Sequence, residues 1–223
     1  MKKVNARILV TIGVASLLLS GCATQSNRAI ETPVVASYQS DYQGKKMPIV
    51  VTGFVNASDY QSGLFSSDED QMGKQAQTIL MSHLQQTNHF KVMDRNQLEK
   101  MQKEAELLGQ TQNMSGARYT ISGSVSEFGR KETGDKQFFG ILGSGKQQIA
   151  YANVTLIVSD VLTAEVVYSI QGAGEYQLST REIAGFGGSA GYDSTLNGKV
   201  LNFAITEAVN KLVDSLDENG WVQ

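Results

Sequence analysis

The sequence of 223 residues predicts an α/β (α+β) fold, in which helices flank a mixed sheet and two β-hairpins are inserted. Short apolar segments with the two-residue alternation of strands occur in both halves of the chain. Other segments repeat apolar residues at the 3.6-residue spacing of amphipathic helices. Two further segments, rich in glycine and polar residues, separate the later strands from one another and from the last helix. These three observations lead to the predicted fold class.

Strands and helices alternate in the first half of the predicted body. Residues 48–55 form a short apolar strand, and a helix with apolar residues on one face follows from about residue 72 to 84. A second short strand covers residues 90–93. A second amphipathic helix then runs from about residue 95 to 108. This order predicts a strand-helix-strand-helix unit.

Three strands and a helix follow in the second half. Alternation predicts strands over residues 117–127, 150–160 and 164–170, and helical spacing predicts a last helix from about residue 195 to 216. The predicted body therefore spans residues 48–217. Residues 218–223 are left as a short C-terminal tail.

The N-terminus has the pattern of a bacterial lipoprotein signal peptide. Three positive charges precede an apolar segment at residues 8–19, and Leu-Ser-Gly-Cys follows at the cleavage position. The apolar segment is too short for a membrane-spanning helix. We therefore expect removal of residues 1–21, lipidation of Cys22 and a polar tether over residues 22–47. The alternative is an ordinary secretory peptide with an incidental cysteine.

The residues after the cleavage site predict the compartment. Ala23 follows Cys22, where an aspartate would retain a lipoprotein in the inner membrane. We therefore expect the protein to be anchored in the lipid of the outer membrane of a Gram-negative bacterium, with its body in the periplasm. Without the signal peptide, 16 basic residues stand against 22 acidic ones, which argues against nucleic acid as a partner.

The two inserted hairpins cover residues 128–149 and 167–193. The first carries charges on both faces, whereas the second has an apolar and a polar face with the alternation of a membrane-spanning strand. The residues of the second hairpin predicted to face lipid are Tyr168, Ile170, Tyr176, Leu178, Phe186 and Tyr192.

Four strands cannot close a barrel by themselves. If the hairpins cross the membrane, several subunits must share one barrel, because hydrocarbon does not tolerate open sheet edges. The hairpins then predict a homo-oligomeric ring with a shared oligomeric β-barrel. The alternative is a pair of long β-ribbons in water, since the barrel signal of one strand is weak.

Each pattern that resembles a catalytic or cofactor site lacks a residue or a structural element that such a site needs. Residues 140–146 match a phosphate-binding loop, but Gln147 replaces the Ser or Thr that would bind magnesium. Residues 185–190 resemble a dinucleotide fingerprint, but the last helix follows and no second strand completes the unit. His83 and His89 lack a third ligand or a nucleophile. We expect no cofactor, no metal and no catalytic residue, and therefore no enzyme.

The sequence resembles the CsgG/HfaB family of outer-membrane lipoproteins, best known for the curli secretion channel. The resemblance covers nearly the whole mature chain and combines the lipobox with patterns that are individually loose. These patterns lie at residues 49–59, 89–95 with Leu98, 116–125, 139–142, 148–160 and 163–167.

The resemblance implies a periplasmic α/β domain that assembles into a ring, in which each subunit adds two hairpins to one barrel. The family's channels export unfolded protein and cooperate with accessory envelope proteins. In curli channels the loop after the first strand narrows the pore with a tyrosine and an Asn-Phe pair. Here Ser67 and Asp68 stand in place of Asn-Phe, with Tyr60 and Phe65 nearby, so the resemblance specifies neither the constriction chemistry nor curli as the cargo.

Two functions follow from the sequence. The first is a subunit of an oligomeric secretion channel for extracellular fibre or adhesion proteins. The second is a non-channel periplasmic lipoprotein of related fold that docks on and activates an envelope partner such as a peptidoglycan synthase.

Overall fold

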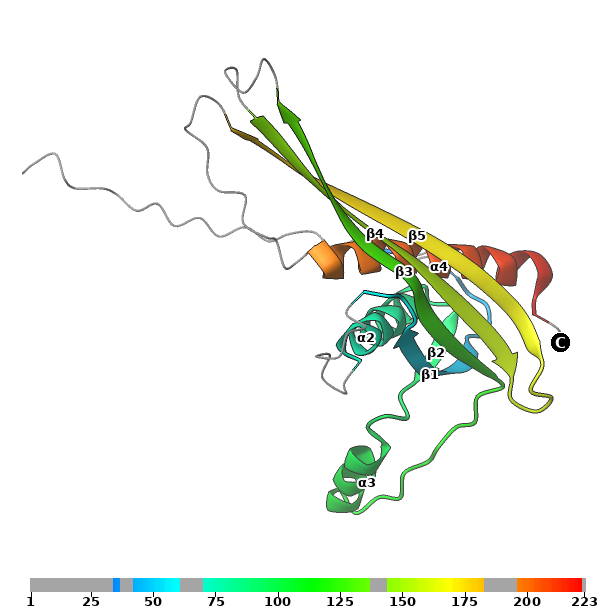
Figure 1. The fold of residues 1–223 in the computed structure, drawn as a ribbon. Helices are drawn as coiled ribbons and strands as arrows, with labels where there is room; N and C mark the ends of the chain where they lie inside the picture. Colours follow the sequence, from blue (N-terminus) through cyan, green and yellow to red (C-terminus); the bar gives the residue numbers. More distant parts are fainter. Residues whose placement is uncertain (1–33, 37–41, 61–69, 137–143, 183–195, 222–223) are drawn as a thin grey trace, which may run out of the picture. The chain divides into compact units, whose positions relative to one another are not determined.

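Five strands form one mixed sheet in the order β2-β1-β3-β4-β5 (Figure 1). The computed structural model describes residues 34–36, 42–60, 70–136, 144–182 and 196–221, with side chains described except at 132–136, 144–148, 178–182, 196 and 219. All of these residues belong to one unit, Pro33–Gln223. The elements are β1 (Met47–Asn56), α2 (Gln71–Gln86), β2 (Phe90–Met93), α3 (Leu98–Leu107), β3 (Tyr119–Lys136), β4 (Ser144–Asp160), β5 (Val166–Glu182) and α4 (Leu196–Asn219).

Both parallel and antiparallel pairs occur in this sheet. β1 pairs in parallel with β2 and with β3, and α2 makes the connection between β1 and β2 that parallel strands require. β3, β4 and β5 are antiparallel neighbours. The predicted fold class, an α/β fold with a mixed sheet and flanking helices, is therefore confirmed.

The last three strands are much longer than their apolar patterns predict. The sequence places the end of one strand at residue 127 and the start of the next at residue 150, but β3 continues to Lys136 and β4 begins at Ser144. A register shift between Val125 and Glu127 interrupts the side-chain alternation while the strands stay paired. Backbone hydrogen bonds need no apolar side chains, so the ladder continues where the sequence pattern ends. Residues 128–136 and 144–149 are thus continuous with β3 and β4.

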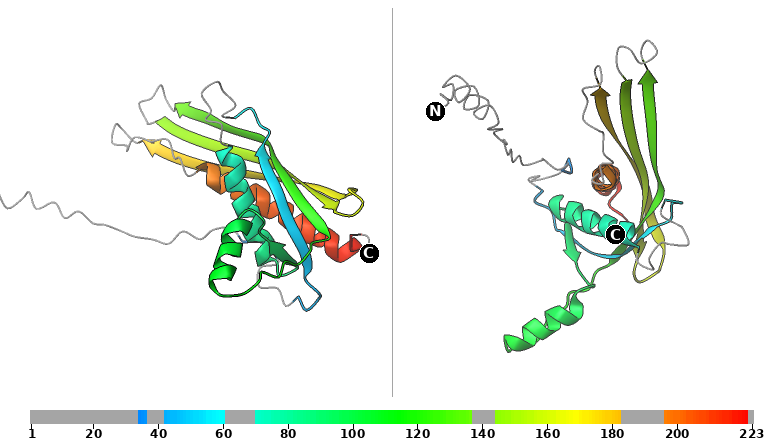
Figure 2. Two further views of the ribbon diagram at one scale, coloured as in Figure 1. Left: turned by 90° about the horizontal axis from the view of Figure 1, so that it is seen from below. Right: turned by 60° about the vertical axis from the view of Figure 1, so that its left-hand side comes forward.

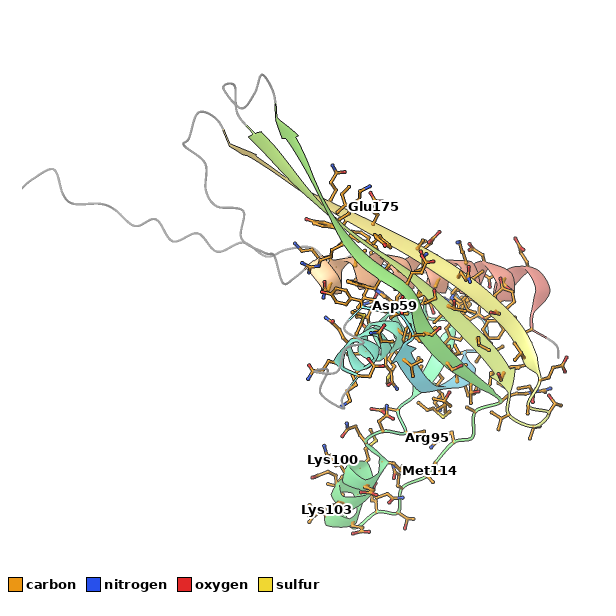
Figure 3. All side chains as sticks on the ribbon, viewed as in Figure 1. Asp59, Arg95, Lys100, Lys103, Met114 and Glu175 are labelled. Atoms are coloured by element: carbon orange, nitrogen blue, oxygen red, sulfur yellow. The ribbon has the colours of Figure 1, made fainter. Side chains whose placement is uncertain are left out.

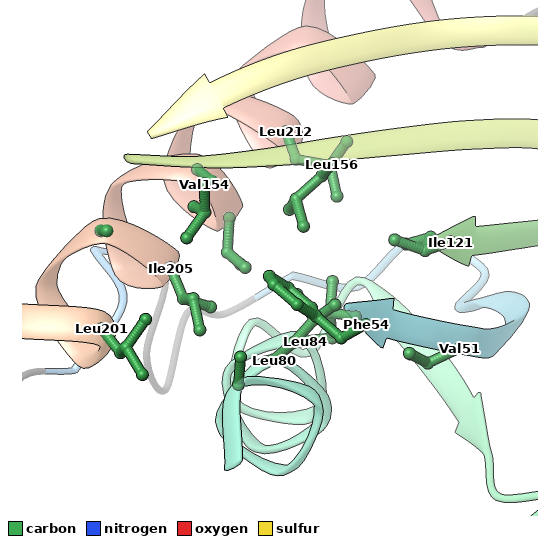
Figure 4. Close-up of a cluster of buried hydrophobic side chains, with 14 of the residues drawn as sticks. Val51, Phe54, Leu80, Leu84, Ile121, Val154, Leu156, Leu201, Ile205 and Leu212 are labelled. Atoms are coloured by element: carbon green, nitrogen blue, oxygen red, sulfur yellow. The ribbon is translucent and has the colours of Figure 1, made fainter. Parts of the chain in front are cut away.

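One face of the sheet is covered by α2 and α4 (Figure 2), and the main core lies between the sheet and these helices (Figure 4). Alternate residues of β4 point into this core, and those at 150, 152, 154, 156 and 158 are fully buried. The largest fully buried core side chains are Phe90, Ile49, Leu80, Leu84, Ile121, Leu156, Leu201, Ile205, Leu212, Val35 and Val125.

α4 is buried on more than the face that the sequence predicts. Val200, Ala204 and Ala208 are buried as expected, but Leu201 and Ile205 are buried as well. The reason is that α4 packs against β4 and β5 on one side and against α2 on another. Two packing partners bury a wider surface than a single apolar stripe.

Two glycines of β5 allow α4 to approach the sheet closely. A Cβ on Gly172 would lie 2.2 Å from the carbonyl oxygen of Ala204 and 2.6 Å from the amide nitrogen of Ala208. A Cβ on Gly174 would lie 2.6 Å from the amide nitrogen of Ala204. These distances are shorter than any ordinary contact, so a side chain at either position would push the helix from the sheet.

One residue of the expected tail at residues 218–223, Trp221, is part of the core. Helix α4 ends at Asn219, and Trp221 is 5% exposed. The indole stacks on Phe90 and Tyr168, with ring centroids 5.9 and 6.3 Å apart, and meets Tyr119 edge to face. The Tyr119 hydroxyl also donates a hydrogen bond to the Trp221 carbonyl at 3.0 Å.

Part of the expected tether at residues 22–47 also packs on the body. Val35 is 1% exposed and belongs to the core, and the Ala36 amide donates to Asn210 Oδ1 at 2.8 Å. Further along, the ring of Tyr42 lies 4.0 Å from that of His89. The sequence misses this docking because one valine in a polar segment has no periodic pattern.

The predicted helix from residue 95 to 108 is shorter in the structure, and its apolar face is not buried. α3 begins at Leu98, and none of its residues is buried. Of the residues predicted to share its apolar face, Leu98 and Ala105 are half-buried, whereas Met101 and Leu108 are 41% and 76% exposed. The amphipathic spacing identified the helix but not a surface that covers it. Lys100, Lys103 and the nearby Met114 are labelled in Figure 3.

A buried carboxylate organises the turn between β4 and β5. Asp160 is 5% exposed and accepts hydrogen bonds from Arg118 Nε at 3.0 Å, from the Leu162 amide at 2.8 Å and from the Thr163 amide at 3.3 Å. The hydrogen bond from Arg118 and that from the Leu162 amide hold the pKa of Asp160 below its ordinary value. The turn itself lies where the sequence places it.

We expect Gly172→Ala to lower the free energy of unfolding by about 1–3 kcal/mol, because the added methyl group overpacks the contact with α4. Urea unfolding of the full chain, followed by circular dichroism, measures this. Gly116→Ala is the matched control, since a Cβ there meets nothing within 4 Å. Equal stability of the two variants would contradict the close approach of α4.

We expect Asp160 to make stability depend on pH. Because its pKa is lowered in the folded protein, its contribution is complete above the unfolded carboxyl pKa of about 3.9 and is lost as the pH falls through the lower folded value. Asp160→Asn should remove this component of the pH dependence. The measurement is the unfolding free energy from neutral to acidic pH, with Glu106→Gln on the exposed helix α3 as the control.

Candidate functional site

The outer part of the sheet is a three-stranded ribbon made of β3, β4 and β5. β1 pairs with β3 no further than Val125, whereas β3 stays paired with β4 as far as Lys136. β4 and β5 stay paired as far as Glu182. Among the described residues, no strand pairs with the outer edge of β3 beyond Val125 or with the outer edge of β5. The ribbon therefore has two open edges.

The expected second hairpin at residues 167–193 is only partly described. Its first arm belongs to β5, and residues 183–193 lie outside the described part of the chain, together with Phe186 and Tyr192. The backbone of Leu178 continues β5, but its side chain is not among those described.

The structure corrects the predicted lipid-facing role of Tyr168, Ile170 and Tyr176. All three are half-buried and pack against the core on the face that α4 covers. Tyr168 stacks on Trp221, and Tyr176 stacks on Phe203 at a centroid distance of 6.3 Å. The alternation of apolar residues was identified correctly, but here it is explained by a helix and not by lipid.

The cover that α4 gives to the ribbon ends near Tyr176. Lys199, in the first turn of the helix, places its ammonium 4.9 Å from the centroid of the Tyr176 ring. On β3, the Arg130 guanidinium binds Asn197 Oδ1 through Nε at 3.0 Å and through Nη2. α4 begins one residue earlier, at Leu196, whereas β5 continues to Glu182. The ribbon thus extends past its helix.

The opposite face of the three strands is polar, and neither α2 nor α4 lies on it. Asn153 Nδ2 donates to Glu127 at 2.7 Å on this face, and Glu175 is exposed nearby (Figure 3). Two larger side chains, Tyr151 and Ile157, are 42% and 36% exposed. The smaller or uncharged polar residues that share the face are Ser122, Ser124, Thr155, Ser169, Gln171 and Gln177.

The predicted constriction loop is closed at its base by one aspartate. Asp70 Oδ1 accepts from the Gly73 amide at 2.7 Å and caps α2, while its Oδ2 accepts from the Asn56 amide at 2.7 Å. Asp70 is therefore the N-cap of α2. It joins the end of β1 to the start of α2.

The first residues of this loop are held against the body. The side-chain Nδ2 of Asn56 donates a hydrogen bond to the Tyr60 carbonyl oxygen at 2.9 Å. The centroid of the Tyr60 ring lies 4.5 Å from that of Phe128 on β3. Tyr60 is half-buried there, so the structure places this predicted constriction residue against the ribbon. The other three, Phe65, Ser67 and Asp68, lie outside the described residues.

The remaining candidate sites have structural surroundings. His83 Nδ1 lies 3.1 Å from Gln86 Oε1, and its Nε2 lies 3.1 Å from the Thr206 hydroxyl. His89 Nδ1 lies 2.7 Å from the Thr87 carbonyl oxygen. Residues 144–146 of the phosphate-loop pattern lie in strand β4, where a helix N-terminus would be needed.

The described residues contain neither a metal-binding cluster nor a membrane-spanning helix. No group of three or more His, Cys, Asp or Glu residues in this part of the chain is arranged to bind a metal ion. No helix in the described part is both long and apolar enough to cross a membrane.

The chain matches the sequence model of a known protein family over most of its length. The sequence model of the family described as "Curli production assembly/transport component CsgG" matches residues 34–223. The chain belongs to the CsgG family. This confirms the resemblance found in the sequence, and the match begins next to the docked residue Val35.

A curated relative is similar over its whole length. The chain is 52% identical over 221 residues to a protein of Neisseria meningitidis serogroup B named "Putative lipoprotein NMB1126/NMB1164". The alignment covers 99% of this chain and 98% of the relative. The family and this relative together support the coarse prediction, a lipoprotein of the CsgG family.

Solved structures of related proteins are more distant. The PelC dodecamer from Paraburkholderia phytofirmans has 18% identity and a TM-score of 0.34, covering 81% of this chain and 93% of that one. Lipoprotein GNA1162 from N. meningitidis has 12% identity and a TM-score of 0.37, covering 76% and 99%. The LpoB C-terminal domain from Salmonella enterica has 16% identity and a TM-score of 0.32, covering 59% and 85%. With scores this low, no property of these proteins is transferred to this chain.

Sequence reasoning missed the residues that connect distant elements. Asp70 carries a recognisable capping signal, but its bond to Asn56 spans a loop. Glu207 and Lys211 show the i,i+4 spacing of a helical ion pair, yet their bonds to the backbone of β5 depend on where α4 packs. Only the tertiary structure reveals these bonds.

We expect Asp70→Ala to lower the unfolding free energy by about 1–2 kcal/mol, since the N-cap of α2 is lost. The Asn56 amide should also exchange its hydrogen faster, because the same substitution removes its acceptor. Hydrogen exchange with denaturant unfolding measures both effects. Asp70→Asn keeps one acceptor oxygen and should give an intermediate result; unchanged exchange at Asn56 in Asp70→Ala would contradict the clamp.

Proposed function

We propose that this protein is an outer-membrane lipoprotein that assembles into a ring of identical subunits and forms a secretion channel for unfolded protein. The observation that carries the proposal is the three-stranded ribbon, which extends past the cover of α4 and has two open edges. Neither edge can stay unpaired in hydrocarbon, where each unsatisfied backbone group costs several kcal/mol. Pairing between subunits satisfies both edges at once.

The geometry of the edges favours a ring over a symmetric dimer. One open edge belongs to β3 and the other to β5, so contact between them joins two different surfaces. Such heterologous contacts close into rings when the rotation between neighbours permits it. The subunit number follows from that rotation.

Lipidation of Cys22 keeps the body near the membrane. Because Val35 is buried in the core and the Ala36 amide bonds to Asn210 of α4, the tether between Cys22 and the body consists of residues 23–33. Eleven extended residues reach about 40 Å at most. This length supports a body that stays close to the inner surface of the outer membrane, with the lipid, the secreted chain and accessory envelope proteins as its partners.

The two faces of the ribbon differ in polarity, which supports a channel lumen on one face and an outer surface on the other. The face opposite α2 and α4 is polar and mostly uncharged, as in an aqueous channel. The face of Tyr176 is apolar until the helix cover ends. We assign the polar face to the lumen along which the secreted chain passes. We propose the loop at residues 56–70 as the constriction, with Phe65, Ser67 and Asp68 as its candidate lining, whereas Tyr60 packs on Phe128 at the helix-covered face and anchors the loop.

A specific observation favours a second candidate function. α4 already covers Tyr168, Ile170 and Tyr176, and Lys131 is exposed on β3. A ribbon that stays in water would have these features. In that case the protein is a periplasmic lipoprotein that docks on an envelope partner, such as a peptidoglycan synthase, and activates it.

The deciding experiment is single-channel conductance of the detergent-extracted, lipidated protein in a planar bilayer. Oligomer size is measured on the same preparation. We expect stable conductance steps from a ring-sized complex. A monomeric protein without conductance would contradict the channel and favour the docking function.

A charge in the second hairpin tests whether it meets lipid. We expect Leu178→Arg to abolish conductance, because an arginine on a lipid face costs about 2–4 kcal/mol at mid-bilayer. Gln177→Arg is the matched control on the neighbouring residue of the polar face and should still conduct. If both variants conduct like the unmodified protein, the hairpin does not face lipid.

A further inference from the structure

The outer edge of β5 is partly occupied by side chains of α4. The Ala173 amide donates a hydrogen bond to Glu207 Oε2, and Lys211 Nζ donates to the Gln171 carbonyl at 3.1 Å. The two side chains also form an ion pair, with Lys211 Nζ 2.9 Å from Glu207 Oε1. One helix thus supplies an acceptor and a donor to two successive outward-facing positions of the strand.

These positions are the ones that another strand would use. In an antiparallel pair, successive residues alternate between bonding the partner strand and facing away from it. Gln171 and Ala173 face away from β4, so the backbone groups of Glu175 and Gln177 do so as well. Among the described residues, no hydrogen-bond partner is found for the outward amide of either residue. Within this part of the chain, the edge is therefore filled at residues 171–173 and open from residue 175.

The close approach of α4 makes this contact possible. Gly172 lies between the occupied positions and Gly174 follows them, and both allow the backbone of α4 to approach β5. At this short distance, the side chains of Glu207 and Lys211 are long enough to reach the outward-facing backbone groups of β5. Both side chains remain 42–44% exposed, so water still solvates their charges. Burial opposes ionisation of Glu207, but the bonds from Ala173 and Lys211 hold its pKa below the ordinary value.

We propose that the Glu207–Lys211 pair closes the edge of β5 at residues 171–173 and confines strand addition by a second copy of this chain to β5 beyond Ala173. This rests on the proposed ring, in which the β5 edge meets a neighbouring subunit. A strand that continued along residues 171–173 would have to displace both charged side chains from their bonds. The pair thus sets where the contact between copies stops and keeps the body portion of β5 from pairing.

The same arrangement protects the free protein. An open strand edge is a template for uncontrolled pairing, and charged side chains at the edge are a common way to block it. Here the charges come from a helix, so they block the edge without interrupting the strand itself. The unblocked part of β5 is the part that extends past the start of α4.

Hydrogen exchange at single amides tests the closure in the lipidated full chain, held monomeric in detergent. We expect the Ala173 amide to exchange at least about tenfold more slowly than the amides of Glu175 and Gln177. Glu207→Leu should remove this difference. Glu207→Gln keeps an acceptor oxygen and should retain most of it, and Asp214→Leu on the exposed side of α4 is the control. Equal exchange at Ala173 and Glu175 in the unmodified protein would overturn the proposal.

The limit on strand addition is tested with the double variant Glu207→Leu, Lys211→Leu. In assembled unmodified protein, the amides of Glu175 and Gln177 should become protected while that of Ala173 keeps its monomer value. In the double variant, protection on association should extend to Ala173. If the variant associates with Ala173 still unprotected, or stays monomeric with an open edge, the pair does not block strand addition.

These results separate the two levels of the proposal. Absence of any oligomer of the unmodified protein, with a slow Ala173 amide in the monomer and association only of the double variant, would contradict the ring but support the closed edge. A conducting ring in which Ala173 becomes protected together with Glu175 would support the ring and overturn the closure.

Discussion

The close packing of α4 on β5 is the constraint on which the rest of this structure depends. Gly172 and Gly174 remove the side chains that would hold the helix away, and the backbone of α4 fills that space. From this position α4 packs on both the sheet and α2, so the sheet, α2 and α4 all contribute side chains to one core. The same helix accepts the hydrogen bond of the Ala36 amide through Asn210, and Trp221 after its end stacks on Phe90 and Tyr168.

The extent of α4 also divides the long strands into two environments. Alongside the helix, the apolar face of β5 is buried in the ordinary way, and the edge is satisfied by Glu207 and Lys211. Past Leu196 the strands continue without this helix. In hydrocarbon, the backbone groups at the edges of this part would need partners from outside the described residues, because unsatisfied groups are costly there. The position of one helix terminus thus decides which part of the sheet belongs to the body.

Membership of the CsgG family agrees with this division between a body and a ribbon. The body has the features of a stable domain: a continuous core, a capped α2 and a clamped turn at Asp160. Among the described residues, the ribbon has two edges without a strand partner and two unlike faces, and the proposed ring would pair these edges between subunits. The short tether after Cys22 would hold such a body at the membrane where assembly takes place. An activator that docks on a partner would use the body and leave the ribbon in water.

The sequence alone determined the family, the fold class and most elements, because these depend on local patterns. Residues 48–55, 72–84 and 90–93 have periodicities that one strand or helix explains, and β1, α2 and β2 lie there. The apolar alternation of Tyr168, Ile170 and Tyr176 was also real, but periodicity reports that a face is covered and not what covers it. A helix and a lipid bilayer are equally apolar, so only the position of α4 distinguished them. Contacts between remote residues were likewise decided by tertiary structure alone. Ala36 with Asn210, Asp70 with Asn56, and Glu207 with Ala173 each join groups whose proximity no spacing in the chain encodes.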